Sequence, residues 1–317
     1  MKTVPETEIA RVRSVLSGAA GWKNAELTVQ PLTGGNCHKN YLVNNGDRRC
    51  VVKLWNNYWE SVGVLPAANV VLQNTRVAAE VGVGAPVIMI SEEPLGLALD
   101  FLVGGHPDLL HDDDAVGNLV PTLHKLHRSG RRFLNDIDPF ALARHRLDAS
   151  RAQGSPIPLG ITAVQRMMDR IEKVLSLEAS TFVPCHLDLW NANVIKPNDT
   201  SSYSIIDWDL AGNCDPCYDV GFVAAMNGFD EEKCRELFIA YFGEEDERQF
   251  ARTRLFMAVA HWSKSALWIS AQGNADPNDG ADYEGELAIS WEGLLAELTA
   301  PNLHQVLAAA AKPPVLV

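Results

Sequence analysis

Two short stretches of the sequence decide the fold: Cys185-His186-Leu187-Asp188-Leu189-Trp190-Asn191-Ala192-Asn193 and Ile205-Ile206-Asp207-Trp208-Asp209. The first places an amide five residues after a carboxylate, and the second places another carboxylate directly behind two β-branched residues. Phosphoryl transfer from ATP uses one carboxylate to take the acceptor proton, while an amide oxygen and a second carboxylate hold magnesium. Asp188, Asn193 and Asp207 fit these roles, so we expect ATP and Mg²⁺ as cofactors.

A chain of 317 residues exceeds the size at which one hydrophobic core usually stops growing, so we expect two lobes around a cleft. Its 47% hydrophobic and 21% charged residues are typical of a folded protein. The N-terminus, Met1 to Glu6, lacks an apolar leader, and no run approaches the roughly 18 apolar residues of a membrane span. We therefore predict a cytoplasmic protein with no membrane partner.

The net charge of −13 is distributed unevenly. Residues 1–103 carry 9 Lys/Arg and 9 Asp/Glu, so the remaining 18 and 31 place the whole excess in residues 104–317. A negative field disfavours nucleic acid as a partner and attracts a cationic small molecule. Solubility alone explains the charge equally well. We expect a small-molecule acceptor as the partner, with a cationic one favoured, and either a monomer or a homodimer.

The six cysteines are scattered, which favours reduced thiols over a disulfide framework in a chain of this length. The spacing of Cys214-Asp215-Pro216-Cys217 resembles half of a metal site, but a structural zinc site usually needs a second Cys/His pair nearby. A turn with two buried thiols is the main interpretation, and a zinc or redox site is the alternative.

Residues 1–103 combine two helical patterns with several short strand patterns. Apolar residues at helical spacing predict helices over 5–17 and 67–81, the second of which ends at Gly82. The remaining apolar runs predict antiparallel strands at 27–29, 41–43, 50–54, 87–90 and 97–103.

From residue 104 onward, helical patterns dominate, at about 112–129, 139–150, 161–178, 218–226, 231–242, 247–272 and 282–299. Strand patterns remain at 193–195 and 203–206. We therefore predict an α+β protein with a small β-rich N-lobe containing one main helix (1–103) and a large α-helical C-lobe (104–317). The junction, Phe101 to Gly105, is the expected hinge.

Lys53 ends an apolar strand pattern and follows a glycine-containing turn, Leu32 to His38. Gly34 and Gly35 would let backbone N–H groups approach phosphate oxygens, and a following strand can present a lysine to the α- and β-phosphates. Alone, this pair is weak evidence, because Gly-Gly turns and edge lysines are common. The turn and Lys53 become informative because they precede Asp188 in the order expected for a phosphotransferase.

The order of these motifs resembles the aminoglycoside phosphotransferase and choline kinase superfamily, which has a protein-kinase-like, two-lobed fold. The resemblance rests on His186-x-Asp188-x-x-x-x-Asn193 and on Ile206-Asp207-Trp208-Asp209-Leu210-Ala211-Gly212, with Asp215-Pro216 and Asp219 following. The choline/ethanolamine kinase branch is the most similar, because its glycine-rich loop and its Asp-Trp-Glu-x-Ala-Gly run resemble 34–41 and 207–212 here. The likeness spans residues 30–295.

This resemblance implies Asp188 as the catalytic base, with His186 as the brace of its loop, and Asn193 and Asp207 as the magnesium ligands. The nucleotide contacts that it implies lie in the loop, the strand and the hinge: Gly34, Gly35, Lys53, Phe101 and Val103. Taken alone, each polar residue has a structural explanation as a turn, cap or core residue. An Asp directly after Ile205-Ile206, however, would end a buried strand without a partner unless it meets a cation.

Two departures from the family pattern concern the nucleotide. Kinase-like folds pair the strand lysine with a glutamate of the next helix, but Val71 stands at that position, and Glu80 is the one acid in 66–81. Either Glu60 or Glu80 substitutes, or Lys53 relies on phosphate alone. In the glycine-rich loop, Cys37 and His38 replace Thr and Asn of many relatives, so we expect one phosphate-binding hydroxyl to be missing.

Aromatic faces attract quaternary ammonium groups by about 0.5–2 kcal/mol per ring, and choline kinases use aromatic residues in their C-terminal part. The candidate acceptor contacts here are Asp209, Trp262, Trp268, Tyr283 and Trp291. Ser265 and Glu286 stand where two family aromatics would be, so this box is incomplete. Helix packing is an equally good explanation for the rings. The acids at 282, 284 and 286 are an alternative site for a primary amine.

The leading hypothesis is an ATP- and Mg²⁺-dependent kinase for a hydroxyl of a small, amine-bearing metabolite, with choline or ethanolamine as the first candidate. An aminoglycoside, thiamine or another hydroxylated compound is the alternative acceptor. A catalytically weak, nucleotide-binding pseudokinase is an alternative of another class, motivated by the missing helix glutamate.

Overall fold

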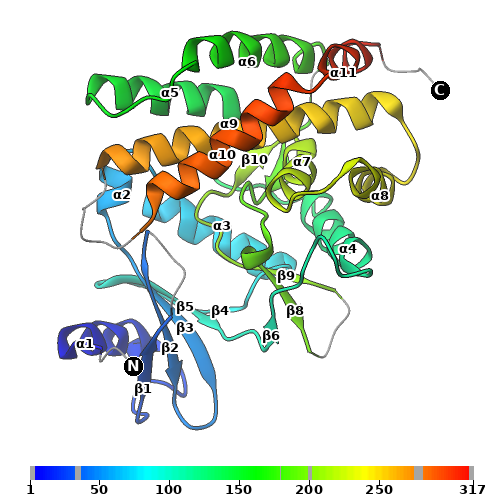
Figure 1. Cartoon of the computed structure of the whole chain (residues 1–317). Helices are drawn as coiled ribbons and strands as arrows, with labels where there is room; N and C mark the ends of the chain where they lie inside the picture. The colour runs from blue at the N-terminus through cyan, green and yellow to red at the C-terminus, as the bar shows by residue number, and fades with distance from the viewer. Residues whose placement is uncertain (1–3, 33–36, 179, 199–201, 275–280, 314–317) are drawn as a thin grey trace.

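The computed structural model describes residues 4–32, 37–178, 180–198, 202–274 and 281–313. An antiparallel sheet with its flanking helices forms one lobe, and a larger group of helices forms the other (Figure 1). The predicted α+β, kinase-like architecture is therefore confirmed. The short strands of the catalytic region lie in the helical lobe, on the side that faces the sheet (Figure 1).

The N-lobe sheet has five antiparallel strands in the order β1 (Thr28–Pro31), β2 (Lys39–Asn44), β3 (Arg49–Leu54), β5 (Leu95–Asp100) and β4 (Val87–Glu92). Side chains alternate between the two faces of a strand. Cys50, Val52 and Leu54 pack with α1 (Glu6–Val15) on one face. Lys53 therefore points to the other face, where α3 (Ala68–Val81) packs on Leu97.

The helices of the structure follow the predicted ranges closely. For example, α3 ends where Gly82 takes a left-handed conformation, with φ of 74°. The others that were predicted are α4 (Ala115–His127), α5 (Pro139–Ala152), α6 (Ile161–Leu175), α7 (Pro216–Met226), α8 (Glu231–Phe242), α9 (Glu247–Asn274) and α10 (Tyr283–Thr299). Two short helices, α2 (Tyr58–Ser61) and α11 (Leu303–Ala310), were not predicted.

Helix α9 forms the centre of the C-lobe. It contacts α5, α7, α10 and α11 and is buried along most of its length, from Ala251 to Ala271 (Figure 1). A helix that is apolar all round is buried on all sides, and α9 is mostly apolar over 255–271. Helix α7 approaches α9 closely at Gly221, where an added Cβ would lie 2.9 Å from the Thr253 carbonyl oxygen and 3.0 Å from Phe256.

Gly221→Ala is therefore expected to lower the free energy of unfolding by about 1–3 kcal/mol, because the backbone of α9 cannot yield to a new methyl group. Gly117→Ala in α4 is the matched control. Gly117 is exposed and an added Cβ there meets no atom within 4 Å, so this variant is expected to gain up to about 1 kcal/mol from helix propensity. Urea unfolding of both variants measures the difference; equal effects of the two substitutions would contradict the close approach.

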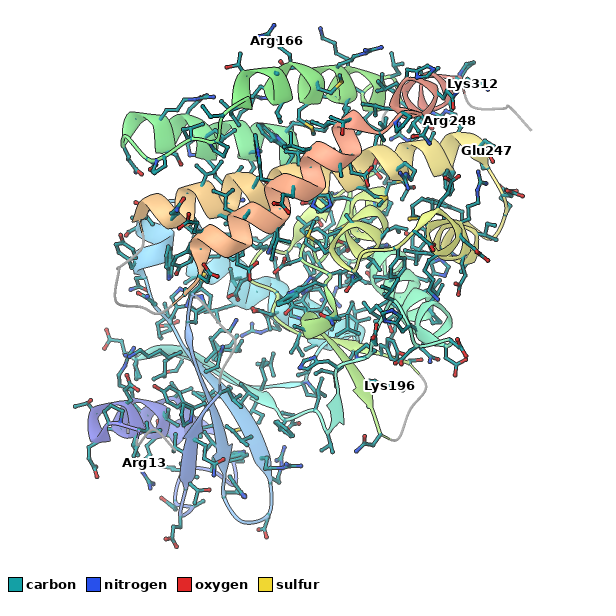
Figure 2. All side chains as sticks on the ribbon, in the orientation of Figure 1. Arg13, Arg166, Lys196, Glu247, Arg248 and Lys312 are labelled. Atoms are coloured by element: carbon teal, nitrogen blue, oxygen red, sulfur yellow. The ribbon has the colours of Figure 1, made fainter. Side chains whose placement is uncertain are left out.

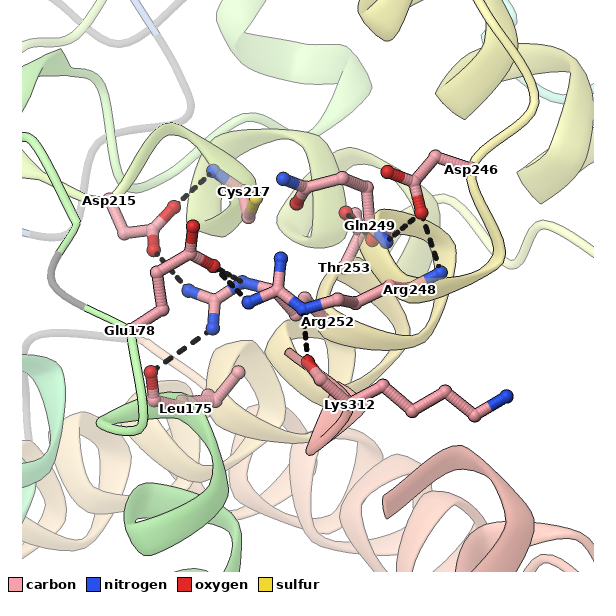
Figure 3. Close-up of polar contacts among 10 residues, drawn as sticks. All are labelled: Leu175, Glu178, Asp215, Cys217, Asp246, Arg248, Gln249, Arg252, Thr253 and Lys312. Atoms are coloured by element: carbon pink, nitrogen blue, oxygen red, sulfur yellow. Dashed lines mark hydrogen bonds and ion pairs between the residues drawn. The ribbon is translucent and has the colours of Figure 1, made fainter. Parts of the chain in front are cut away.

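A buried ion pair ties α6, α7 and α9 together (Figure 3). Asp215 accepts a hydrogen bond from the Cys217 N–H at the start of α7, at 2.9 Å, and its other oxygen lies 3.1 Å from Arg252 of α9. Arg252 also donates to the carbonyl of Leu175, at the end of α6. These contacts fix the N-terminus of α7, the helix that reaches the catalytic loop.

The outer faces of both lobes carry charged side chains (Figure 2). The space between the ribbons is also filled by side chains (Figure 2). Arg13 on α1, Arg166 on α6 and Lys196 on β8 (Val194–Pro197) are exposed and point outward (Figure 2). In the described part of the chain, no helix combines the length and apolar character that crossing a membrane requires.

Candidate active site

The two polar stretches of the sequence lie side by side because short strands pair around them. Strand β7 (Val183–Cys185) pairs with β10 (Gly212–Cys214), and β8 pairs with β9 (Ser204–Ile205). Between these strands, the Ile206 N–H donates to the Asn193 carbonyl at 2.9 Å. The catalytic loop, residues 186–193, is therefore held directly against the segment that carries Asp207.

His186 is fully buried and joins the same two segments. Its Nε2 lies 2.9 Å from the Ile206 carbonyl oxygen, and its Nδ1 lies 3.2 Å from the Asp188 N–H. A carbonyl accepts and an N–H donates, so the ring is the neutral tautomer with its proton on Nε2. The structure thus places His186 as a brace of the loop, in contact with the Asp188 backbone.

Asp219 of α7 is hydrogen-bonded to the backbone of the catalytic loop. Its carboxylate accepts hydrogen bonds from the N–H groups of His186 and Leu187, at 2.7 and 2.8 Å, and lies 3.1 Å from His127 Nε2. Leu187 has a positive φ of 66°, a conformation that is uncommon for a residue with a side chain. The two hydrogen bonds hold this backbone in place, so Asp219 positions the residue that follows, Asp188.

Two side chains contact the Asp188 carboxylate. Lys264 Nζ of α9 lies 2.8 Å from Oδ1. Asn193 Nδ2 donates to the Asp188 carbonyl at 2.8 Å and lies 3.3 Å from Oδ2. Because its nitrogen is engaged in this way, Asn193 would present its amide oxygen to a metal ion.

Asp207 and Asp209 share one cation. Lys53 Nζ lies 2.8 Å from Asp207 Oδ1 and 2.7 Å from Asp209 Oδ1. Burial would raise the pKa of Asp207, but the Lys53 ammonium outweighs it and holds the pKa low. The pKa of Asp209 is raised by burial and by the neighbouring Asp207 charge. The ammonium therefore keeps Asp207 ionised, as a metal ligand must be.

The acid partners of Lys53 come from the C-lobe and not from the two expected glutamates. Glu60 accepts a hydrogen bond from the Ala68 N–H at the start of α3, at 2.9 Å, and Glu80 pairs with Arg131 on the surface. The expectation that one of them substitutes for the helix glutamate is wrong, because both carboxylates have partners elsewhere.

A family model described as "Phosphotransferase enzyme family" matches residues 28–256, which include all of these groups except Lys264. The chain belongs to this phosphotransferase family. This membership confirms the predicted superfamily and the predicted class of enzyme, a small-molecule kinase. Among curated protein sequences, none matches the chain.

Solved structures with the same fold include further phosphotransferases. A choline/ethanolamine kinase family protein from Mesorhizobium loti has 20% identity and a TM-score of 0.80, over 96% of this chain and 99% of its own. A choline kinase from Streptococcus pneumoniae has 16% identity and a TM-score of 0.75, over 92% and 100%. A spectinomycin phosphotransferase has 16% identity and a TM-score of 0.57, over 98% of both chains.

The oxygen donors of this phosphotransferase suit magnesium. Asn193 and Asp207 offer an amide oxygen and a carboxylate, the hard ligands that Mg²⁺ prefers. The hydrogen bond between the Ile206 N–H and the Asn193 carbonyl keeps their two segments adjacent. The donor set therefore fits the metal, and the remaining ligands would come from water and phosphate oxygens.

The predicted nucleotide contacts are only partly visible. Gly34 and Gly35 lie outside the described residues. Phe101 follows β5, where its N–H donates to the Arg49 carbonyl at 3.2 Å and its ring lies under the Arg49 guanidinium. The Val103 side chain is exposed, and its carbonyl accepts from the Asn198 N–H at 3.3 Å. The nucleotide roles of Phe101 and Val103 stay predictions.

One residue of the glycine-rich loop that is described, His38, faces the acid pair. Its Nε2 lies 3.5 Å from Asp209 Oδ2, and its Nδ1 accepts from the Asn56 N–H at 3.1 Å. Burial, and then the Lys53 charge, lower the pKa of His38 to about 3, so the ring is neutral. Asp209 therefore lies on the Lys53 side of the site, although it was a candidate for acceptor contact.

The four candidate aromatics do not form one cage. Trp268 and Tyr283 are neighbours, with ring centroids 6.1 Å apart, and Trp59 joins them at 6.0 Å from Tyr283. Trp262 is buried in the main core, and Trp291 packs against that core. Lys264 Nζ lies 4.8 Å from the centre of the Trp268 ring, so the chain's own cation occupies that face.

Replacing Lys53 by Met is expected to weaken ATP binding by tenfold or more, because a charged hydrogen bond contributes about 1.5–3 kcal/mol. Glu80→Gln is the control and should leave the ATP affinity unchanged, since Glu80 pairs with Arg131 on the surface. Calorimetric titration of both variants with ATP measures the effect. A loss of affinity in Glu80→Gln equal to that in Lys53→Met would show that Glu80 does support the lysine.

Proposed function

We propose that this phosphotransferase moves the γ-phosphoryl group of ATP, with Mg²⁺, to a hydroxyl of a small molecule. The observation that carries the proposal is the convergence of Asp188, Asn193 and Asp207 with Lys53, which comes from the other lobe. Two solved relatives support a nucleotide donor, because one is a complex with AMP and the other a complex with ADP and spectinomycin.

In the proposed reaction, Asp188 takes the proton of the acceptor hydroxyl. The hydroxyl oxygen bonds to the γ-phosphorus as the bond from that phosphorus to the β–γ bridging oxygen breaks, and ADP leaves. Lys53 places its positive charge at the phosphates. When bound by Asn193 and Asp207, magnesium neutralises phosphate charge.

For the acceptor, the names of the relatives supply a starting point. The Mesorhizobium and Streptococcus proteins are named as choline/ethanolamine and choline kinases, and another relative is named for spectinomycin. Choline or ethanolamine is therefore the first candidate, with aminoglycosides, thiamine and other hydroxylated compounds as alternatives. The positive charges of Lys264 and Arg146 on this side of Asp188 favour a different class of acceptor, one that carries a negative charge.

The test is ADP release from Mg²⁺-ATP against a panel of amino alcohols, aminosugars, vitamins and hydroxy acids. We expect at least one compound to raise ADP release well above the rate with water alone, and removal of Mg²⁺ by EDTA to abolish it. If ATP binds but no compound on the panel is phosphorylated, the pseudokinase becomes the better account.

A further inference from the structure

A cavity of about 220 Å³ lies next to the catalytic base. Its walls include Leu187 of the catalytic loop, Leu142 of α5 and Leu267 of α9, and most of its surface is apolar. Leu187 directly precedes Asp188, and the lining residue Lys264 is hydrogen-bonded to Asp188. This volume is somewhat below the range of typical ligand pockets, which starts at about 300 Å³, so the space suits only a small molecule. The cavity therefore has the position and size for a small acceptor.

Two cationic side chains, Arg146 and Lys264, line this otherwise apolar cavity. Among the described residues that line it, none is an Asp or Glu. A cationic acceptor would lie near the like charge of Arg146, which is unfavourable, whereas the charge of Lys264 is balanced by Asp188 at 2.8 Å. The lining thus opposes the cationic acceptor that the overall charge of the chain favoured.

Arg146 is buried, and no Asp or Glu of the described residues forms an ion pair with it. Only 5% of the residue is exposed, its Nη2 donates to the Val64 carbonyl at 2.8 Å, and its Nε has no hydrogen-bond partner. Burial lowers the pKa of Arg146 to about 10, so the guanidinium is still charged at neutral pH. A buried, unpaired charge is costly. An anion in the cavity would supply the missing partner.

Lys264 links the cavity to the reaction centre. Its ammonium contacts Asp188 Oδ1 at 2.8 Å while its side chain lines the cavity. An ammonium has three donors, so it can hold Asp188 and contact a bound molecule at the same time. Lys264 is the single Lys, Arg, Asp or Glu among residues 255–271. Most of the other residues in this run of α9 are buried.

We propose that this cavity binds an acceptor that carries a carboxylate, and that the enzyme phosphorylates the hydroxyl of a small hydroxy acid. The carboxylate pairs with Arg146, the hydrocarbon part contacts the apolar walls, and the hydroxyl reaches Asp188 beside Lys264. The proton passes to Asp188 and ADP leaves, as in the proposed function on which this inference rests. A bidentate pair with a carboxylate is the contact that guanidinium geometry favours.

The first part of the test compares acceptors on the wild-type enzyme. The probes are 3-hydroxypropionate, 4-hydroxybutyrate and 5-hydroxypentanoate, the primary amides of these acids, and the amino alcohols of the same chain lengths. We expect the acids to exceed the amides and amino alcohols in kcat/KM by about tenfold to a hundredfold. If amino alcohols are phosphorylated and the acids are not, the inference fails and the proposed function survives. If no probe and no panel compound is phosphorylated, the proposed function fails as well.

The second part uses Arg146→Gln and its neighbour on the same helix. Arg146→Gln should raise KM for the preferred acid by about tenfold to a hundredfold, with kcat and the KM for ATP little changed, and Arg146→Lys should restore part of the loss. Arg144→Gln is the control, because Arg144 pairs with Glu172 on the surface, at 2.7 Å. If Arg146→Gln raised KM for the acid and for its amide equally, Arg146 would have only a structural role. If Arg146→Gln does not fold, the ratio of kcat/KM for the acids to kcat/KM for their amides in the wild-type enzyme still tests whether a carboxylate is preferred.

Discussion

Asp188→Asn is expected to lower kcat for phosphoryl transfer by about 10²- to 10⁴-fold, the usual contribution of a general base. Asn has nearly the same shape as Asp and keeps an oxygen for the Lys264 ammonium, but it cannot accept the hydroxyl proton. The affinity for ATP should stay the same, because Asp188 contacts Lys264 and Asn193 rather than Lys53. Steady-state ADP release and ATP titration together separate the two effects.

Asp148→Asn is the control for this experiment, since Asp148 is an exposed carboxylate on α5 that contacts only Arg151 among the ion pairs of the described residues. This variant should keep wild-type turnover. An unchanged kcat in Asp188→Asn would exclude Asp188 as the base and would move the reaction centre elsewhere.

Asp207→Asn should raise the Mg²⁺ concentration for half-maximal activity by tenfold or more and should also lower kcat. Replacing a carboxylate by an amide removes a charged ligand, and Lys53 loses one of its two partners. Asn is the suitable replacement because Asp207 has a φ of 65°, and Asn tolerates this left-handed conformation better than most residues. Backbone strain then does not confuse the result.

The measurement is a Mg²⁺ titration of ADP release at saturating ATP, with Asp148→Asn again as the control. A midpoint that is the same as in the wild-type enzyme would remove Asp207 from the metal site. Thermal melting without Mg²⁺ should be run in parallel, because a large loss of stability would mean that the fold, and not the metal, had changed.

Most of the helices could be predicted because local apolar periodicity and terminating glycines indicate where a helix lies and where it ends. Helix α3 begins within a residue of the predicted start and ends at Gly82, whose left-handed conformation stops the helix. Strand β7 was missed because it spans three residues, contains Pro184 and exists through pairing with β10, which is distant in sequence. Such non-local pairing leaves no periodic signal.

The candidate catalytic residues could be named from the sequence because they lie at fixed spacing within two segments, and their catalytic roles stay predictions. The residues that support them could not, because they come from other elements. Asp219 was part of a recognised motif, but its two hydrogen bonds to the catalytic loop depend on how α7 is anchored. For Lys264 a signal existed, because it is the single Lys, Arg, Asp or Glu in the otherwise apolar-rich run 255–271.

The aromatic residues show why the acceptor site was harder to predict. Trp262 and Trp268 lie on the same buried helix, yet Trp262 belongs to the main core and Trp268 to a cluster with Trp59. Helical spacing does not distinguish a ring that packs from a ring that binds. Arg146 carries no local motif at all, and its significance appears only with the cavity.

In the proposed reaction, the γ-phosphoryl group passes from ATP to a hydroxyl held at Asp188. This transfer can be measured by incubating the enzyme with Mg²⁺-ATP and the best acceptor of the panel, and by quantifying ADP and phosphorylated acceptor in one sample by mass spectrometry. We expect equal amounts of the two products in the wild type and almost none of either in Asp188→Asn. ADP without phosphorylated acceptor, or full product formation by Asp188→Asn, would contradict the proposed reaction.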